Sequence, residues 1–454
     1  MSVQLRSYLF GWRPVYEGMK SNPIIQHEGG IPERRSSPLA RRSLWLLLGV
    51  VLCVHLGVVL ASRNGIVRDD ASSYVLLGHN LAGGYGYVFT PGDTPTSWRA
   101  PGYPVYLASI FWLSGGSLKA AKIMHAFTWV LTALLIYLLG CRLIGERAAL
   151  LGAGLVGLYP EFVGFTGLLW SENLYIGLFV ATLLVLLWAV PDHGPWYAVL
   201  LAGGLLGAST LTRSTSVILF PVLGFMALHS TNRMAALWRV VLVCALALVI
   251  IGAWAVRNTQ LHGRFILVES NAGFNLYVGN NPKTPVPFAF KMLHHIQDDV
   301  RYLELTSGRT EGERNVALTR AALEYIKTHP GREIALMIGK LIDFWLPDFF
   351  IARNVKSGAL GLERANMWLP VLALTAGCFL VCSLAAMRDA LRNRHDFATQ
   401  LIIVTLILYT APHLLVYGAS RYHLPLMPLV LLLAAREITR WREGRRMRLR
   451  LAMT

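Results

Sequence analysis

The sequence has 454 residues, of which 54% are hydrophobic and only 15% are charged, and its mean hydropathy is +0.48. Soluble domains carry roughly 25% charged residues, so this composition excludes a soluble globule, a disordered chain, a coiled coil and a disulfide scaffold. The formal charge of +17 fits either a nucleic-acid-binding protein or a membrane protein that keeps its cations on one side. The positions of the charges decide between the two.

Apolar runs of the length that crosses a bilayer recur along the chain. Ten are predicted to span: 43–62, 120–140, 148–168, 172–190, 196–211, 215–228, 240–256, 367–387, 398–416 and 424–435. A further run, 334–350, contains Lys340 and Asp343 and is rich in aromatic residues. The sequence therefore predicts an all-α integral membrane protein with a bundle of about ten transmembrane helices, or eleven if 334–350 also crosses.

Arginine clusters orient these spans through the positive-inside rule. Basic residues precede the first span and follow the last, so both termini are expected in the cytoplasm and the number of spans is expected to be even. Ten spans keep the internal arginine clusters inside as well, whereas an eleventh would place the last clusters outside. We therefore interpret 333–350 as an interfacial or tilted helix at the outer face. Most of the charge excess then reports membrane orientation and not nucleic-acid binding.

This topology divides the chain into five regions. They are a basic cytoplasmic arm (1–42), helices 1–7 with an outer loop at 63–118 (43–256), an outer loop domain (257–366), helices 8–10 (367–435) and a basic cytoplasmic tail (436–454). The outer loop domain is expected to be small and mixed, with a short strand at 265–269. Thr310 and Glu313 have the spacing of a capping box, and the helix that they start is expected to end before His329 and Pro330.

The loop after the first span contains two adjacent carboxylates, Asp69 and Asp70, at the start of a predicted amphipathic helix that includes Tyr74. Two carboxylates at a membrane surface repel each other and lose solvation, so one is expected to be paired with a cation or to have a raised pKa. Such a pair suits a general base or a metal ligand, while a solvated acidic pair is the simpler interpretation. Arg99 adds a cation on a Pro-rich turn later in the loop.

Four cations lie at the outer ends of spans, where the positive-inside rule does not favour them: Arg213, Arg257, Lys340 and Arg421. Each alone could be a snorkelling anchor, but together they place several cations at one height, which suits a lipid phosphate. Glu172 stands at an outer span end as well. It is either an ordinary helix start capped by Ser171 or a functional acid.

The stretch 271–282 is rich in turns and amides and includes Asn275 and Asn280 beside Phe274 and Tyr277. An ordered loop and a site for a polar, ring-shaped ligand are both compatible with it. Neither the cysteines nor the histidines have the spacing of a metal site. No nucleotide-hydrolysing Gly-rich loop is found, which argues against an ATP-driven pump.

Seven segments in this order resemble a known family: DDASSYVLLGHNLAGGYGY, RAPGYP, SENLY, LTRS, GNNP, HPGREIALMIGKLIDFW and RYHLPLMP. Over about residues 44–436 the chain resembles the bacterial GT-C glycosyltransferases of the family 39-like branch, which includes protein O-mannosyltransferases and lipid A aminoarabinose transferases. Ser214 departs from the pattern, because many relatives have Pro after the arginine.

The resemblance implies a multi-pass enzyme of the bacterial inner membrane, with its active site facing the periplasm, that uses a polyprenyl-phosphate-linked hexose or pentose. Asp70 would be the catalytic base, Asp69 its neighbour or substitute, and Glu172 the second acidic position. The substrate-binding residues would be Arg99, Tyr74, Arg213, Arg257, Asn275, Asn280, Lys340, Arg421 and Tyr422.

We expect inverting sugar transfer to a lipid, glycan or protein, without a required cofactor. A divalent metal is compatible with the site but not demanded by it, and no nucleic-acid partner is expected. Two alternatives remain: a transporter or flippase of a lipid-linked sugar, and a non-catalytic assembly partner that has kept the fold.

Overall fold

The computed structural model describes residues 38–62, 70–191, 194–285, 296–360, 366–416 and 418–451, and every regular element in these ranges is a helix. The first half contains α2 (Pro38–Ala61), α3 (Asp70–Ala82), α4 (Gly102–Ser114), α5 (Leu118–Leu143), α6 (Glu146–Gly157), α7 (Pro160–Phe165), α8 (Glu172–Ala189), α9 (Trp196–Thr212), η2 (Ser214–Ile218) and α10 (Leu219–Leu228). The all-α prediction is confirmed.

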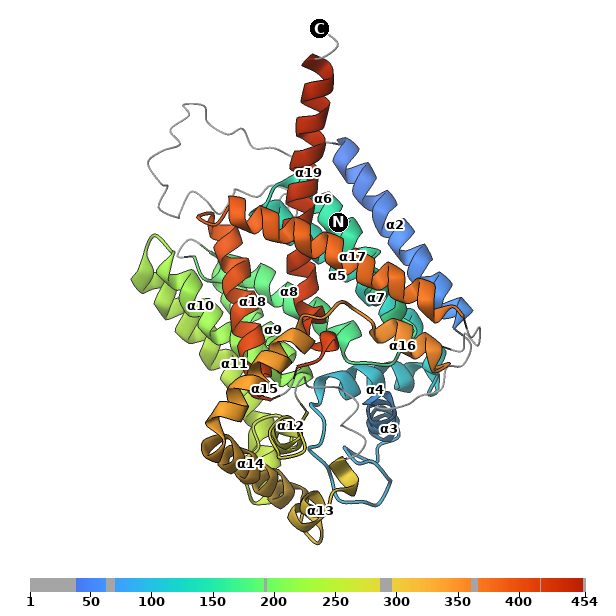
Figure 1. Ribbon diagram of the computed structural model, residues 1–454, viewed down its shortest axis with the longest axis vertical. Coiled ribbons are helices and arrows are strands. Elements are labelled where there is room, and N and C mark those ends of the chain that lie inside the picture. Colours follow the sequence, from blue (N-terminus) through green and yellow to red (C-terminus); the bar gives the residue numbers. More distant parts are fainter. Residues whose placement is uncertain are drawn as a thin grey trace.

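The second half begins with the long helix α11 (Arg233–His262). It continues with α12 (Ala272–Gly279), η4 (Ile296–Asp298), α13 (Val300–Thr306), α14 (Glu311–Thr328), α15 (Pro330–Phe344), α16 (Phe350–Lys356), α17 (Trp368–Arg392), α18 (Phe397–Leu415), η5 (Ser420–Leu426) and α19 (Met427–Leu451). Figure 1 shows α3 and α12–α14 at one end of the bundle, whereas the first turn of α2 and the last turns of α19 lie at the other.

Six described helices are long and apolar enough to cross a membrane: those within Arg41–Ala61, Leu118–Leu143, Glu172–Ala189, Arg233–His262, Trp368–Arg392 and Phe397–Leu415. The other four predicted spans correspond to shorter or interrupted helices: α6 with α7, α9, η2 with α10, and η5 with α19. α15 has 15 residues and is not among the six. The span count of about ten therefore stays a prediction.

Small residues let the helices of the bundle approach closely. Gly203 and Gly207, four apart on α9, face α11, where added Cβ atoms would come within 2.6 Å of Leu246 and 2.9 Å of Ile250. This small-xxx-small spacing is typical of helix pairs in membranes, where packing and not the hydrophobic effect holds helices together. A larger residue at either position would push α9 from α11.

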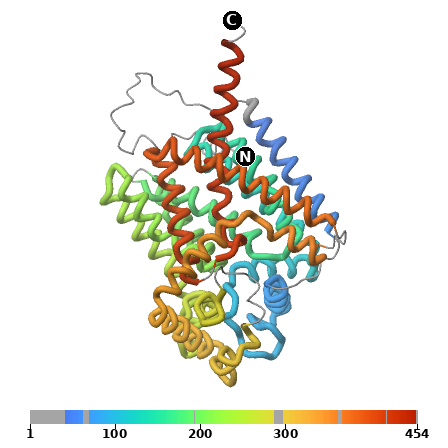
Figure 2. The backbone as a smooth tube through the Cα atoms, viewed as in Figure 1, coloured from blue at the N-terminus to red at the C-terminus, as the bar shows by residue number. Residues whose placement is uncertain are grey.

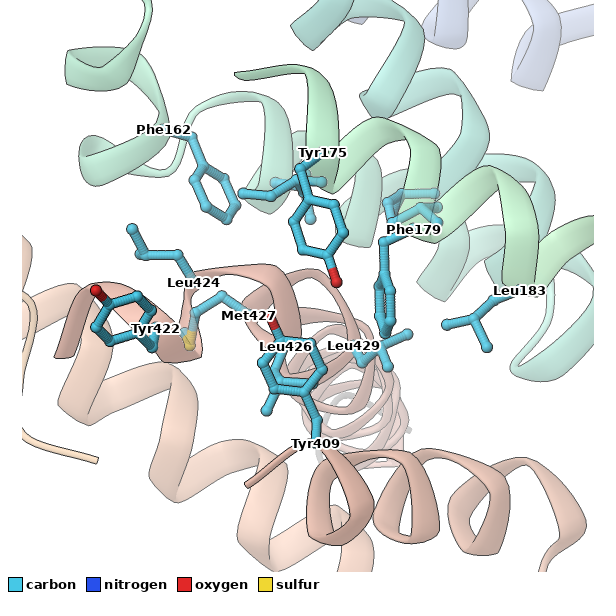
Figure 3. Close-up of a cluster of buried hydrophobic side chains, with 14 of the residues drawn as sticks. Phe162, Tyr175, Phe179, Leu183, Tyr409, Tyr422, Leu424, Leu426, Met427 and Leu429 are labelled. Carbon is cyan, nitrogen blue, oxygen red and sulfur yellow. The ribbon is translucent and has the colours of Figure 1, made fainter. Parts of the chain in front are cut away.

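The centre of the bundle is aromatic. Figure 3 shows Tyr175 and Phe179 of α8 facing Tyr409 of α18 and the apolar residues of η5 and α19, among them Leu424 and Met427. The rings of Phe179 and Tyr409 meet edge to face at 5.8 Å, a favourable geometry for aromatic pairs. This packing fixes η5 against α8, which matters because both elements carry charged residues at their ends.

The segment Phe265–Glu269 corrects the sequence prediction, because it forms no strand. Its side chains alternate as a strand requires, with Ile266 and Val268 buried and Phe265 exposed. The Trp254 indole and the Asn258 amide of α11 donate to the Val268 carbonyl, at 2.8 and 3.2 Å. Side-chain donors from a helix thus occupy the carbonyl that a partner strand would need.

The helix predicted after the capping box is confirmed. Thr310 N donates to the Glu313 carboxylate at 2.9 Å, and Glu313 N donates to Thr310 Oγ1 at 3.4 Å. α14 ends at Thr328, directly before His329 and Pro330. The tube in Figure 2 shows this helix lying with α12 and α13 outside the main bundle.

Candidate active site

Five charged side chains from distant parts of the sequence meet at the end of the bundle where α3 lies. Each stands at the start or end of an element: Asp70 begins α3, Arg99 precedes α4, Glu172 begins α8, Arg213 separates α9 from η2, and Arg421 lies in η5. We call these five residues the outer cluster. Its three guanidinium groups outnumber its two carboxylates by one charge.

Asp70 is held between two arginines. Arg99 Nη2 lies 2.5 Å from Asp70 Oδ1, and Nη1 and Nη2 of Arg421 each donate to Oδ2 at 3.1 Å. Arg99 also donates from Nε to Ser73 Oγ at 3.0 Å, so its orientation is fixed by α3. The Asp70 side chain keeps 26% of its surface exposed, whereas that of Arg421 keeps 7%. The carboxylate is thus paired yet accessible from one side.

Glu172 forms the second pair and is only 1% exposed. Arg213 Nη1 donates to Glu172 Oε1 at 2.6 Å. Arg421 Nε lies 3.3 Å from the same oxygen, but its N–H is not aligned for a hydrogen bond and has no partner among the described residues. Arg421 therefore bridges both carboxylates and keeps one buried donor unused.

Aromatic rings surround the three guanidinium groups. The Arg421 guanidinium lies 4.3 Å from the ring centre of Trp170 and donates to the Tyr422 hydroxyl at 3.1 Å. Arg99 lies over the ring of Tyr74 at 5.2 Å, and the Tyr74 hydroxyl donates to Ser171 Oγ at 3.3 Å. Rings of this kind attract cations through their faces and limit water, so the site suits a ligand with one anionic group.

The charge of Asp70 is strongly stabilised. Burial alone would raise the pKa of its carboxyl, but the charges of Arg99 and Arg421 and their hydrogen bonds hold that pKa well below its usual range. A carboxylate in this state is ionised at any physiological pH. It is also a weak base as long as both arginines remain paired with it.

Comparisons with known proteins found one matching family model and similar folds. Residues 98–256 match the model of the dolichyl-phosphate-mannose-protein mannosyltransferase family. No curated protein sequence matches the chain significantly. The structure is similar to the archaeal oligosaccharyltransferase AglB from Archaeoglobus fulgidus in complex with an inhibitory peptide and a dolichol-phosphate, with a TM-score of 0.56 and 15% identity. The chain has the GT-C membrane fold.

The AglB match covers 91% of this chain and 52% of AglB, so the chain spans about half the length of that protein. The Archaeoglobus fulgidus oligosaccharyltransferase in the apo form matches with a TM-score of 0.56 and 14% identity, covering 90% of this chain and 52% of that one. ArnT from Cupriavidus metallidurans bound to undecaprenyl phosphate matches with a TM-score of 0.41 and 16% identity, covering 87% of this chain and 77% of ArnT.

Seven predicted site residues lie together: the five of the outer cluster, with Tyr74 and Tyr422. Arg257 is not part of the outer cluster. Its Nη1 donates to Thr96 O at 2.7 Å and to Ser97 Oγ at 3.0 Å. It clamps the loop that leads to Arg99. Asp69, the alternative base, lies outside the described residues.

Lys340 and Asn280 form a separate buried pair. Lys340 Nζ donates to Asn280 Oδ1 at 2.7 Å and to the Leu415 carbonyl at 3.2 Å, with Glu333 at 3.4 Å. The side chain of Lys340 is wholly buried, so it is not a snorkelling anchor. Asn275 lies partly buried on α12 near this pair in sequence. Lys340, Asn280 and Leu415 thus join α15, the end of α12 and α18, and among the described residues no hydrogen bond or ion pair of Lys340 reaches the outer cluster's carboxylates.

Sequence reasoning missed a buried polar network behind Arg421. His423 Nδ1 and Nε2 lie 2.5 Å from the Phe344 carbonyl and 2.7 Å from Asp348 Oδ1, and the Tyr159 hydroxyl donates to Asp348 Oδ2. The network ties η5 to the end of α15 and so fixes Arg421. An acid in the apolar run 334–350 is a signal that could have drawn attention to Asp348.

No described group of three or more His, Cys, Asp or Glu side chains is arranged to hold a metal ion. The sequence expectation about a divalent metal therefore stays a prediction.

Proposed function

We propose that the protein is a membrane glycosyltransferase that transfers a hexosyl or pentosyl group from a polyprenyl-phosphate donor to a lipid, glycan or protein acceptor. The outer cluster carries this proposal, because it combines surplus guanidinium charge with an accessible carboxylate in one site. The match of residues 98–256 to a dolichyl-phosphate-mannose-protein mannosyltransferase family and the dolichol-phosphate in the AglB complex support it.

The arginines would bind the donor phosphate. Guanidinium groups recognise phosphate oxygens through paired N–H donors, and the unused Arg421 Nε is such a donor within the site. As the sugar–phosphate bond breaks, the phosphate regains negative charge that the same groups stabilise. The cations thus lower the energy of the transition state more than that of the bound donor.

Donor binding would also activate Asp70. A phosphate that binds Arg99 and Arg421 competes with the Asp70 carboxylate for the same N–H groups. The pKa of Asp70 then rises towards its ordinary range, and the carboxylate becomes a better base when the donor is present. Asp70 accepts the proton of the acceptor hydroxyl or amine, and the acceptor atom bonds to the anomeric carbon. The phosphate leaves with the bonding electron pair, and the configuration at that carbon inverts.

We place the outer cluster at the periplasmic face of the bacterial inner membrane, with both termini in the cytoplasm. The arrangement in Figure 1 supports this orientation, because α3 and α12–α14 lie at the opposite end of the bundle from the last turns of α19, which carry the arginines of the basic tail. The reaction needs no cofactor in this proposal.

The test compares Asp70→Asn with Asp69→Asn in purified protein given a panel of polyprenyl-phosphate sugars, with mass analysis of the products. Asp70→Asn is expected to lower the transfer rate by about 10²–10⁴-fold, the usual contribution of a positioned general base, while donor binding persists. Asp69→Asn is expected to keep most activity. Undiminished transfer in both single variants would refute the assignment of the base.

A further inference from the structure

Glu269 is a carboxylate beside the outer cluster that no step of the proposed mechanism uses. It lies between α11 and α12 in the chain, and its side chain is half-buried. No ion pair joins it to a Lys or Arg side chain among the described residues. A half-buried carboxylate without a cation partner is available to a ligand, so its surroundings decide which ligand it suits.

The backbone around Glu269 is held against the loop that precedes α4. Val268, the residue before it, packs with Ala100 in a small buried core. Ser270, the residue after it, donates from its backbone nitrogen to the Ser97 carbonyl at 2.8 Å. Contacts on both sides of Glu269 thus reach the same short stretch of the loop, which is the stretch that carries the first arginine of the outer cluster.

A hydrogen bond directs the Glu269 side chain to the start of η2. Ser214 Oγ donates to Glu269 Oε1 at 2.8 Å, and Ser214 directly follows Arg213 in the chain. Ser214 is also the residue at which the chain departs from the family pattern, and a proline there has no hydroxyl to donate. The other carboxylate oxygen, Oε2, has no hydrogen-bond partner in the described part of the chain. One oxygen of a fixed carboxylate is therefore left for a ligand.

The charge of Glu269 acts on the outer cluster. Burial lowers the pKa of the Arg99 guanidinium, but the charge of Asp70 and, to a smaller extent, that of Glu269 raise this pKa above its usual value. A carboxylate repels a phosphate. The proposed donor phosphate is therefore favoured beside the unused Nε of Arg421 and not beside Glu269. Glu269 suits a neutral group that donates hydrogen bonds.

Sugar hydroxyls are donors of this kind. In the proposed reaction the transferred sugar is bonded directly to the donor phosphate, so a phosphate held by the arginines brings the sugar into the same site. Hydrogen bonds from hydroxyl groups to an ionised carboxylate are short and strong. A site built to bind a substrate hydroxyl also rejects an analogue that lacks it, because the buried polar group is then left unpaired.

We infer that Glu269 binds a hydroxyl of the transferred sugar, with Ser214 holding the carboxylate in place, and that this contact contributes to the choice of sugar. The inference rests on the proposed transferase function and extends it, because it names a residue that recognises the sugar and not the phosphate. Glu269 takes no part in the making or breaking of bonds. A polyprenyl phosphate without a sugar does not make this contact.

Binding of the donor lipid with and without its sugar tests the contact. The probes are undecaprenyl phosphate and the undecaprenyl-phosphate sugar of the panel that the wild type transfers fastest, titrated into the full chain in detergent micelles by calorimetry. Glu269→Gln keeps the size of the side chain and an acceptor for Ser214 but removes the charge. We expect it to weaken binding of the sugar-bearing lipid by about tenfold and to leave binding of undecaprenyl phosphate unchanged. Equal effects on the two probes, or no effect on either, would overturn the inference.

Glu313→Gln is the matched control. Glu313 is another acid of the outer loop domain, and its carboxylate bonds Thr310 at the start of α14. This variant should bind both probes as the wild type does. Ser214→Ala should weaken binding of the sugar-bearing lipid by less than Glu269→Gln, and the double variant should bind no more weakly than Glu269→Gln alone, because both residues act through one contact. Additive losses would refute the role of Ser214.

Monodeoxy analogues of the transferred sugar identify the hydroxyl. For one analogue, the wild type and Glu269→Gln should bind the lipid equally, because the group that Glu269 binds is missing. A difference between the two proteins that persists with every analogue would contradict a hydroxyl contact. A higher acceptor KM in Glu269→Gln, with unchanged donor binding, would assign the carboxylate to the acceptor and overturn the inference as well.

Two outcomes separate this inference from the proposed function. Arg421→Gln should weaken binding of both probes, since it removes donors to the phosphate that they share. If the wild type transfers no sugar of the panel, both proposals are refuted. If the wild type transfers a sugar and Glu269→Gln binds both probes normally, the transferase function stands and only the role of Glu269 is wrong.

Discussion

Two ion clusters at opposite ends of the bundle are built from the same residue types but are paired in different ways. At the end where α17 meets α19, Asp389 is fully buried, and Arg436 donates from Nε at 2.9 Å and from Nη2 at 2.6 Å to one of its oxygens. Arg436 also donates to Asp396 at 2.8 Å and to Thr399 at 2.5 Å. We call these residues the inner cluster.

In the inner cluster, each guanidinium nitrogen of Arg436 donates to an oxygen, and the Asp389 carboxylate is closed to solvent. In the outer cluster, Arg421 Nε has no hydrogen-bond partner among the described residues, and Asp70 remains partly exposed. A buried carboxylate whose arginine partner is bonded through every nitrogen serves to hold helices together. Incomplete pairing is the difference on which we base the proposal that the outer cluster binds a ligand.

The largest effect is expected at the inner cluster. Arg436→Gln leaves Asp389 buried without its strongest partner, which should lower the free energy of unfolding by about 3–5 kcal/mol. Chemical unfolding in detergent micelles, followed by Trp fluorescence, measures it. Arg147→Gln is the control, because its pair with Glu443 is largely exposed and such pairs contribute about 0–1 kcal/mol. A small loss in Arg436→Gln would remove the contrast between the clusters.

A smaller effect on stability and a large one on rate are expected at the outer cluster. In Arg421→Gln, Asp70 still pairs with Arg99 and Glu172 with Arg213, so the protein should unfold close to the wild-type midpoint. Its kcat should fall by about 10²–10³-fold, as when one donor to a developing anion is removed. Arg421→Lys should restore part of the rate. A stability loss as large as in Arg436→Gln with an unchanged kcat would make the outer cluster structural.

The smallest expected effect is a shift of the acidic limb of the pH–rate profile, which tests the assignment of Asp70 as the base. Activity falls as pH drops through the pKa of Asp70, because only the ionised carboxylate accepts a proton. Arg99 lowers that pKa, so Arg99→Gln should raise it and move the limb of kcat, which reports the donor-bound enzyme, to higher pH by about one unit. Arg257→Gln, which changes no ion pair of Asp70, should leave the limb in place. An unmoved limb in Arg99→Gln would assign the base elsewhere.

Much of the outer cluster was predictable as a set of unusual charges, because its residues stand at recognisable boundaries. Asp70 begins an amphipathic helix, Glu172 follows a plausible cap, and Arg213 and Arg421 interrupt apolar runs. The prediction of a strand at 265–269 was wrong, because an alternating pattern of residues does not supply the partner strand that a strand needs. Here the carbonyl of Val268 is instead bonded by side chains of α11.

The sequence by itself determined the class of protein, the helical content and the capping box, because hydropathy and capping depend on residues close together in the chain. It also singled out four outer cations. Only the tertiary structure showed which of these cations lie beside the carboxylates of the outer cluster. Arg421 meets Asp70 across 351 positions, while Arg257 clamps a loop and Lys340 is buried in a junction. Pairing between distant residues depends on how the helices pack, which no local pattern encodes.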